Sequence, residues 1–133
     1  GLHESDLVLI AARPAMGKSA FALNIAAHAA TKANVPVALF SLEMSKEQMV
    51  NRILCSEAMV DSNKVRTGKI DDDDWVKLAT ALGPLSEAQI YIDDTPGISI
   101  AEINKVLYLC HVIPGFDKSN LVFSRSMFSG NNL

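Results

Sequence analysis

The chain has 133 residues, of which 49% are apolar and 20% are charged, and its formal net charge is −3. This length suits one domain, and the composition supports a packed core rather than wholesale disorder. The apolar runs fall far short of the ~20 residues of a membrane span, and no secretory signal opens the chain. The acidic balance leaves no broad basic surface for nucleic acid. With two cysteines that fit no disulfide framework, we expect a protein of the reducing cytoplasm with no membrane partner.

The first part of the chain alternates predicted strands and helices. The apolar run Leu7–Ile10 predicts a strand that is buried on both faces of a sheet. The alanine-rich segment 19–30 predicts a helix. Val35–Ser41 predicts a second strand, with Pro36 near its beginning because proline cannot donate to a strand ladder.

Helix start signals mark three later segments. Ser45 stands three residues before Gln48, which is the spacing of a capping box, and Ser99 stands likewise before Glu102. Asp71 is the expected N-cap of a helix whose first turn is acidic, as the helix dipole favours.

Two more strands complete the predicted order. Gln89–Ile92 predicts a third strand, which the turn sequence 93–97 follows, and Leu121–Phe123 predicts a last one. Strands that alternate with helices indicate an α/β fold with a mainly parallel sheet flanked by helices.

The segment ARPAMGKS, residues 12–19, lies between the first predicted strand and the first predicted helix. It matches the phosphate-binding loop GxxxxGK[ST] at every defined position, except that Ala12 replaces the first glycine. Backbone N–H groups and the helix dipole bind phosphate in such loops, and Gly17 lets the backbone come close. Lys18 would bring its charge to the β and γ phosphates, and Ser19 would offer a hydroxyl to Mg²⁺. The full spacing favours this interpretation over an ordinary helix-capping surface turn.

Glu43 is the second candidate site residue. It follows the second predicted strand, and ligand sites in open α/β sheets lie beyond the carboxyl ends of the strands. A carboxylate there can orient or deprotonate an attacking water molecule. Taken by itself, the position fits an ordinary solvated glutamate before a helix equally well.

Four segments carry a resemblance to a known family: VLIAARPAMGKSAFALNIA, PVALFSLEMS, RTGKIDDDDW and IYIDDTPGISIAEI. They resemble the C-terminal ATPase domain of DnaB-type replicative helicases, which are RecA-like ring ATPases. The likeness runs from Gly1 to about Ile103. It implies a RecA-like P-loop core, present here in truncated form.

The resemblance also implies site residues and partners. ATP and Mg²⁺ would be the ligands, with Lys18 and Glu43 catalytic and Ser19 at the metal. The parent protein would be a homohexamer that hydrolyses ATP to move along single-stranded DNA and unwind duplexes, with primase and a helicase loader as partners. The residues expected to bind the nucleotide are Ala12, Arg13, Pro14, Ala15, Met16, Gly17, Lys18, Ser19 and Ala20.

The likeness stops after the predicted helix near residue 100. We therefore divide the chain into a partial helicase ATPase domain, 1–103, and a divergent tail, 104–133, that is either a remnant of the Walker B region or disordered. Ser124 stands near the place of the Walker B aspartate, so we expect this chain alone to hydrolyse ATP weakly or not at all. The candidates to replace that carboxylate are Asp93, Asp94 and Asp117. For Asp93 and Asp94 we favour a plain turn-forming role.

Two alternatives remain open from the sequence. The chain could be another RecA-like P-loop ATPase or a small-molecule kinase, although its few arginines are too scattered for a kinase lid. It could also be a non-catalytic module that binds nucleotide and enters an assembly. Mixing the chain with an intact helicase and measuring ATP hydrolysis would separate the latter from an enzyme.

Overall fold

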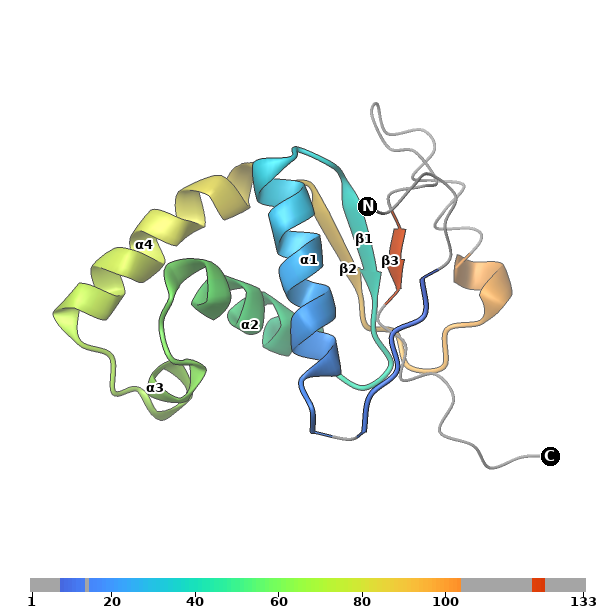
Figure 1. Ribbon diagram of the computed structural model, residues 1–133, viewed down its shortest axis with the longest axis horizontal. Coiled ribbons are helices and arrows are strands. Elements are labelled where there is room, and N and C mark those ends of the chain that lie inside the picture. Colours follow the sequence, from blue (N-terminus) through green and yellow to red (C-terminus); the bar gives the residue numbers. More distant parts are fainter. Residues whose placement is uncertain (1–7, 14, 104–120, 124–133) are drawn as a thin grey trace.

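A computed structural model of the chain describes residues 8–13, 15–103 and 121–123 (Figure 1). Residues 100–103 are helical, in addition to the labelled elements. No helix in this described part is long and apolar enough to cross a membrane. The labelled elements are α1 (Lys18–Lys32), β1 (Val37–Phe40), α2 (Lys46–Ala58), α3 (Ser62–Thr67), α4 (Asp72–Glu87), β2 (Ile90–Asp93) and β3 (Leu121–Phe123).

The three strands form one parallel sheet in the order β2-β1-β3. β1 lies in the centre and is buried along its whole length, with Val37 opposite Ile90 and Ala38 opposite Leu121. Such burial explains why the strand reads as a continuous apolar run rather than an alternating one. The predicted α/β class and the parallel sheet are confirmed.

Helices α1 and α2 cover the same face of this sheet (Figure 1). The side chains of Val37 and Leu39 point to that face and join one buried cluster with residues of both helices. From α1 the cluster takes mainly alanines, among them Ala26 and Ala27, whose small side chains let the helix approach the strand closely. The predicted helix 19–30 is confirmed with slightly wider bounds.

The predicted capping boxes are both present. Ser45 Oγ accepts from Gln48 N–H, and Gln48 Oε1 accepts from Ser45 N–H. Ser99 and Glu102 exchange the same pair of bonds before the helical residues 100–103. These bonds satisfy N–H groups that a helix start leaves without partners.

The predicted first strand is wrong for the residues that the structure describes. Residues 8–10 form no strand, and Val8 and Leu9 are 52% and 83% exposed. β2 and β3 occupy both edges of β1, so residues 8–10 cannot pair with the strand that follows them in the chain. Leu7 lies outside the described residues.

The predicted last strand, residues 121–123, forms as β3 and pairs with β1. The expectation of a disordered tail falls on residues 104–120 and 124–133, which lie outside the described part. Sequence analysis missed the short helix α3, although Asp61 and Gly68 mark its two ends: Asp61 Oδ1 accepts from Asn63 N–H, and Gly68 is left-handed.

A charge cluster connects α3 with the start of α4. Lys64 Nζ donates to Asp71 Oδ2 at 2.8 Å and to Asp74 Oδ2 at 2.7 Å, and Lys77 lies 3.5 Å from Asp74. Asp71 is therefore the N-cap by position, as predicted, but its carboxylate binds Lys64 instead of a helix N–H group. Hydrogen bonds with the two carboxylates, that of Asp71 foremost, raise the pKa of Lys64, and the bond from Lys64 lowers the pKa of buried Asp74.

We predict that Asp74→Asn lowers the urea midpoint of unfolding at pH 7, because it leaves Lys64 without its buried anionic partner. A carboxyl whose pKa is lowered by folding contributes stability above its unfolded pKa of about 4, and this contribution is lost as the pH falls. The difference between variant and wild type should therefore shrink towards pH 3. The control is Asp73→Asn, which removes the same charge from the same turn at an exposed position. Equal midpoints for Asp74→Asn and wild type at pH 7 would contradict the prediction.

Candidate nucleotide-binding site

The loop before α1 bends sharply twice. Met16 N–H donates to Arg13 O at 3.3 Å, and Ala15 and Gly17 both have left-handed backbones, with φ of 64° and 82°. Gly17 is the N-cap of α1, and the first helical bond runs from Phe21 N–H to Gly17 O at 2.9 Å. The left-handed conformation explains the need for glycine at position 17, because a side chain is strained there.

Ala12 departs from the usual motif without a backbone penalty. It is not among the described residues with positive φ, so the backbone there does not require glycine. The sequence expectation that alanine fits this position with negative φ agrees with this geometry.

The first turn of α1 is open to an outside anion. The N–H groups of Lys18, Ser19 and Ala20 have no acceptor in the described part of the chain, and no side chain caps the helix. The first turn also contains no acidic residue. The other three labelled helices differ: side chains cap α2 and α3, and three aspartates occupy the first turn of α4. A helix start attracts negative charge. At α1, unlike at the other three labelled helices, no side-chain acceptor or acidic residue of the described chain supplies it.

The predicted nucleotide-binding residues differ in burial. Lys18, Ser19 and Ala20, at the start of the helix, are half-buried. The loop residues before them are exposed, with Met16 at 72%, so a ligand can reach the backbone from solvent. The exposed loop residues are Ala12, Arg13, Ala15, Met16 and Gly17, and Pro14 lies outside the described residues.

Glu43 lies at the same edge of the sheet as this loop. Helix α1 packs antiparallel to β1, so the beginning of α1 and the end of β1 lie together, at the lower edge in Figure 1. Glu43 follows β1 in a turn that closes when Met44 N–H donates to the buried Ser41 Oγ at 3.0 Å. Its carboxylate is exposed and forms no hydrogen bond within the described residues. The fold thus brings the two predicted parts of the site to one edge.

The two aspartates at the end of β2 have structural partners. Asp93 Oδ1 accepts from Thr95 N–H at 2.9 Å, as in a turn of the Asx type. Asp94 Oδ2 accepts from Lys46 N–H at 2.8 Å, a bond that the sequence analysis missed because its partners lie 48 residues apart. The bond of Asp93 agrees with the turn-forming interpretation, whereas the carboxylate of Asp94 binds the first residue of α2 instead of its own turn. No group of three His, Cys, Asp or Glu in the described part is arranged to hold a metal ion, and Asp117 lies outside that part.

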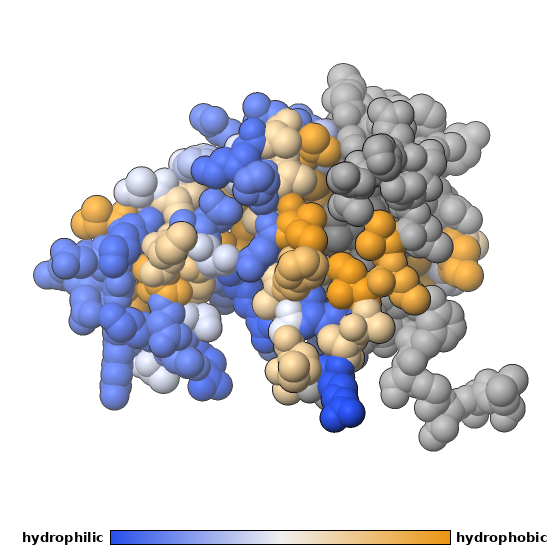
Figure 2. Space-filling view, in the orientation of Figure 1, coloured by the Kyte–Doolittle hydropathy of each residue, from blue (hydrophilic) through white to orange (hydrophobic). Residues whose placement is uncertain are grey.

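The exposed surface is uneven in character. Figure 2 shows hydrophobic surface over the middle of the molecule, whereas the end formed by α3 and α4 is mostly hydrophilic. Val8, Leu9 and Ile10 are among the exposed apolar residues and lead directly into the phosphate-binding loop.

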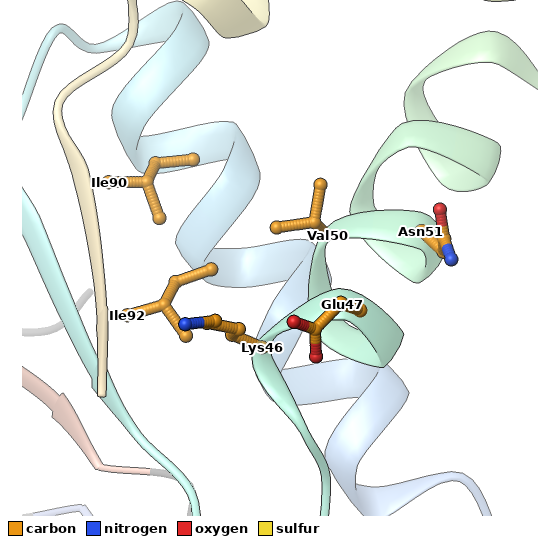
Figure 3. Close-up of a pocket in the computed structure, with 6 residues that line it drawn as sticks. All are labelled: Lys46, Glu47, Val50, Asn51, Ile90 and Ile92. Carbon is orange, nitrogen blue, oxygen red and sulfur yellow. The ribbon is translucent and has the colours of Figure 1, made fainter. Parts of the chain in front are cut away.

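A hollow of about 440 Å³ lies between α2 and β2 (Figure 3). Val50, Ile90 and Ile92 form its apolar wall, and Lys46, Glu47 and Asn51 line its α2 side. No residue of the phosphate-binding loop lines it, so we do not assign the nucleotide to this hollow.

We predict that Gly17→Ala weakens ATP binding by about tenfold or more, because a left-handed alanine costs roughly 1–2 kcal/mol and disturbs the amides of the loop. Titration calorimetry at millimolar nucleotide measures this effect. Gly68→Ala is the matched control: Gly68 has φ of 71° against 82° for Gly17, and an added Cβ meets nothing within 4 Å at either position. Both variants should lose similar stability to urea, but only Gly17→Ala should lose affinity. Equal affinity in both would contradict the assignment.

Comparison with known proteins agrees with this geometry. The family model described as DnaB-like helicase C terminal domain matches residues 1–112. The replicative DNA helicase DnaB of Geobacillus stearothermophilus is 55% identical over 103 residues, which are 77% of this chain and 23% of that protein. The replicative DNA helicase DnaC of Bacillus subtilis (strain 168) is 53% identical over the same share of each chain.

Two solved structures share the fold. A DnaB-like replicative helicase, described together with its interactions with primase, matches with a TM-score of 0.81 and 32% identity, over 92% of this chain and 29% of that one. A second structure, described as an ATPase domain, matches with a TM-score of 0.72 and 27% identity, over 90% of this chain and 44% of that one. The chain spans about a quarter of the length of the two curated relatives. Its fold is therefore the RecA-like one expected from the sequence, and the chain belongs to the family of DnaB-like helicase C-terminal domains.

Proposed function

We propose that this chain is the nucleotide-binding part of the ATPase domain of a replicative DNA helicase. The observation that carries the proposal is the open start of α1, where the N–H groups of residues 18–20 lack acceptors in the described part of the chain and where Lys18 is the first helical residue. A triphosphate supplies the negative charge that this helix start favours. Membership of a helicase family supports ATP over other anions.

The loop residues have distinct roles in this proposal. The amides of the loop and first helical turn bind the phosphate oxygens, and Lys18 places its charge beside the β and γ phosphates. Ser19 would hold Mg²⁺ through its hydroxyl oxygen, a hard ligand of the kind that this ion prefers. When bound, Mg²⁺ neutralises charge on the phosphates. Arg13 and Met16 line the nucleotide.

Glu43 is the residue that we assign to the attacking water. Its carboxylate is exposed at the edge of the sheet where the phosphate-binding loop lies, and no side chain of the described part forms a hydrogen bond or ion pair with it. A free carboxylate can accept a hydrogen bond from water and turn an oxygen lone pair towards the γ phosphate. Together, Lys18 and Glu43 make up the proposed catalytic pair.

The function of the whole protein extends this proposal. Relatives of more than three times the length are replicative DNA helicases, and one solved relative is described with primase. We infer a cytoplasmic homohexamer that uses ATP to move along single-stranded DNA, with primase and a helicase loader as partners. The partial ATPase domain would comprise residues 1–103, and residues 104–133 would be a divergent tail. The chain by itself would turn over ATP weakly, since the Walker B position holds no aspartate.

We predict that Lys18→Ala weakens ATP binding by about 10- to 100-fold, because it removes a charge-assisted contact to phosphate. The matched control is Lys32→Ala, at the other end of the same helix. Calorimetry with MgATP measures both. Loss of affinity in the control alone, or in neither variant, would refute the proposed site.

We predict that Glu43→Gln leaves MgATP affinity within about twofold and lowers hydrolysis by about 100-fold, the lower range for loss of a group that handles a proton. Release of radiolabelled phosphate detects turnover even when it is slow. The control is Glu47→Gln, an exposed acid in the first turn of α2. If both variants hydrolyse ATP at the wild-type rate, Glu43 does not serve the reaction.

A further inference from the structure

The loop that carries Glu43, residues 41–46, is held at both ends by the last residues of β2 and the residue after it. At its start, Ser41 N–H donates to the backbone oxygen of Asp93 at 2.9 Å. At its end, Lys46 N–H donates to Asp94 Oδ2 at 2.8 Å. A loop whose two ends are hydrogen-bonded to a neighbouring strand has fewer conformations to explore than a loop that is held only by its chain connections.

The interior of this loop is closed by its own side chains. The hydroxyl oxygen of Ser41, which is only 6% exposed, accepts from Met44 N–H, so Leu42 and Glu43 form the tip of a tight turn. Ser45 then accepts from Gln48 N–H and begins α2. The direction of the Glu43 side chain therefore depends on where the two ends of the loop are held.

Asp94 supplies what the local sequence does not. Lys46 is the first residue of α2, so its N–H group has no acceptor inside the helix. The capping box serves Ser45 and Gln48 and leaves Lys46 to another partner. A carboxylate suits this place, because the helix start is electropositive and a charged acceptor makes a stronger bond. Figure 3 shows the Lys46 side chain extended towards Ile92 of β2, so the start of α2 lies against that strand.

We propose that Asp94 is a positioning residue that fixes the loop bearing Glu43 through its bond to the Lys46 amide. The inference rests on the proposed function only in assigning Glu43 to the attacking water. It gives the Asp-Asp pair at the end of β2 a role without a metal ion: the backbone of Asp93 holds the start of the loop, and the carboxylate of Asp94 holds its end.

The test compares Asp94→Ala, Asp94→Asn and Glu47→Ala in the full chain. Asp94→Ala removes the acceptor, Asp94→Asn keeps an acceptor oxygen without the charge, and Glu47→Ala removes a charge beside Lys46 without touching the bond. Hydrogen exchange of the Lys46 amide, measured by NMR in the presence and in the absence of MgATP, reports its bond to Asp94. Phosphate release at several ATP concentrations separates kcat from KM. Exchange of the buried β1 amides reports whether each variant is folded.

We expect Asp94→Ala to speed exchange at Lys46 by about tenfold and to lower kcat several-fold at unchanged KM. Asp94→Asn should lie between Asp94→Ala and wild type, and Glu47→Ala should be indistinguishable from wild type. Unchanged Lys46 exchange in Asp94→Ala, with β1 still protected, would overturn the inference. So would faster exchange with wild-type kcat, provided that Glu43→Gln lowers kcat. If wild type shows no turnover, as expected for a chain without the Walker B aspartate, exchange at Lys46 alone decides whether Asp94 holds the loop. If wild type hydrolyses ATP and Glu43→Gln does not slow it, the role proposed for Glu43 fails, and exchange at Lys46 again decides for Asp94.

Discussion

The packing of α1 against β1 is the constraint on which the site depends. The contact face of the helix is built from small residues, and Ala26 and Ala27 are completely or almost completely buried against the strand. Because the connection between the two elements is short, the helix runs antiparallel to the strand, and its first turn lies where the strand ends. The loop before α1 and the turn that carries Glu43 after β1 therefore lie at the same edge of the sheet.

The four labelled helices differ in what satisfies the N–H groups of their first turn. In α2 the Ser45 hydroxyl and the Asp94 carboxylate satisfy the first amides, and in α3 Asp61 does so. Only in α1, among these helices, do an uncapped first turn and the absence of a nearby acid coincide. Leaving buried or half-buried N–H groups without acceptors is unfavourable, so this open turn is consistent with a site that is completed by a ligand.

Much of this arrangement could be predicted from the sequence, because the signals are local. The capping box at Ser45, the acidic turn after Asp71 and the glycine at position 17 each express a preference of a few neighbouring residues. The failures concern partners distant in sequence. No local pattern shows that β2 and β3 fill both edges of β1, or that Asp94 binds the amide of Lys46.

The order of strands also has a consequence for the way the chain folds. Helices α1 to α4 form from contiguous residues, whereas β1 must await β2, which arrives after three helices, and β3, which arrives later still. Such non-local pairing slows folding, because loop closure must precede the contacts that reward it. During synthesis the phosphate-binding loop and β1 would emerge well before Asp93 and Asp94. The nascent chain would therefore hold residues 12–19 and Glu43 before it acquires the two residues that fix the loop bearing Glu43.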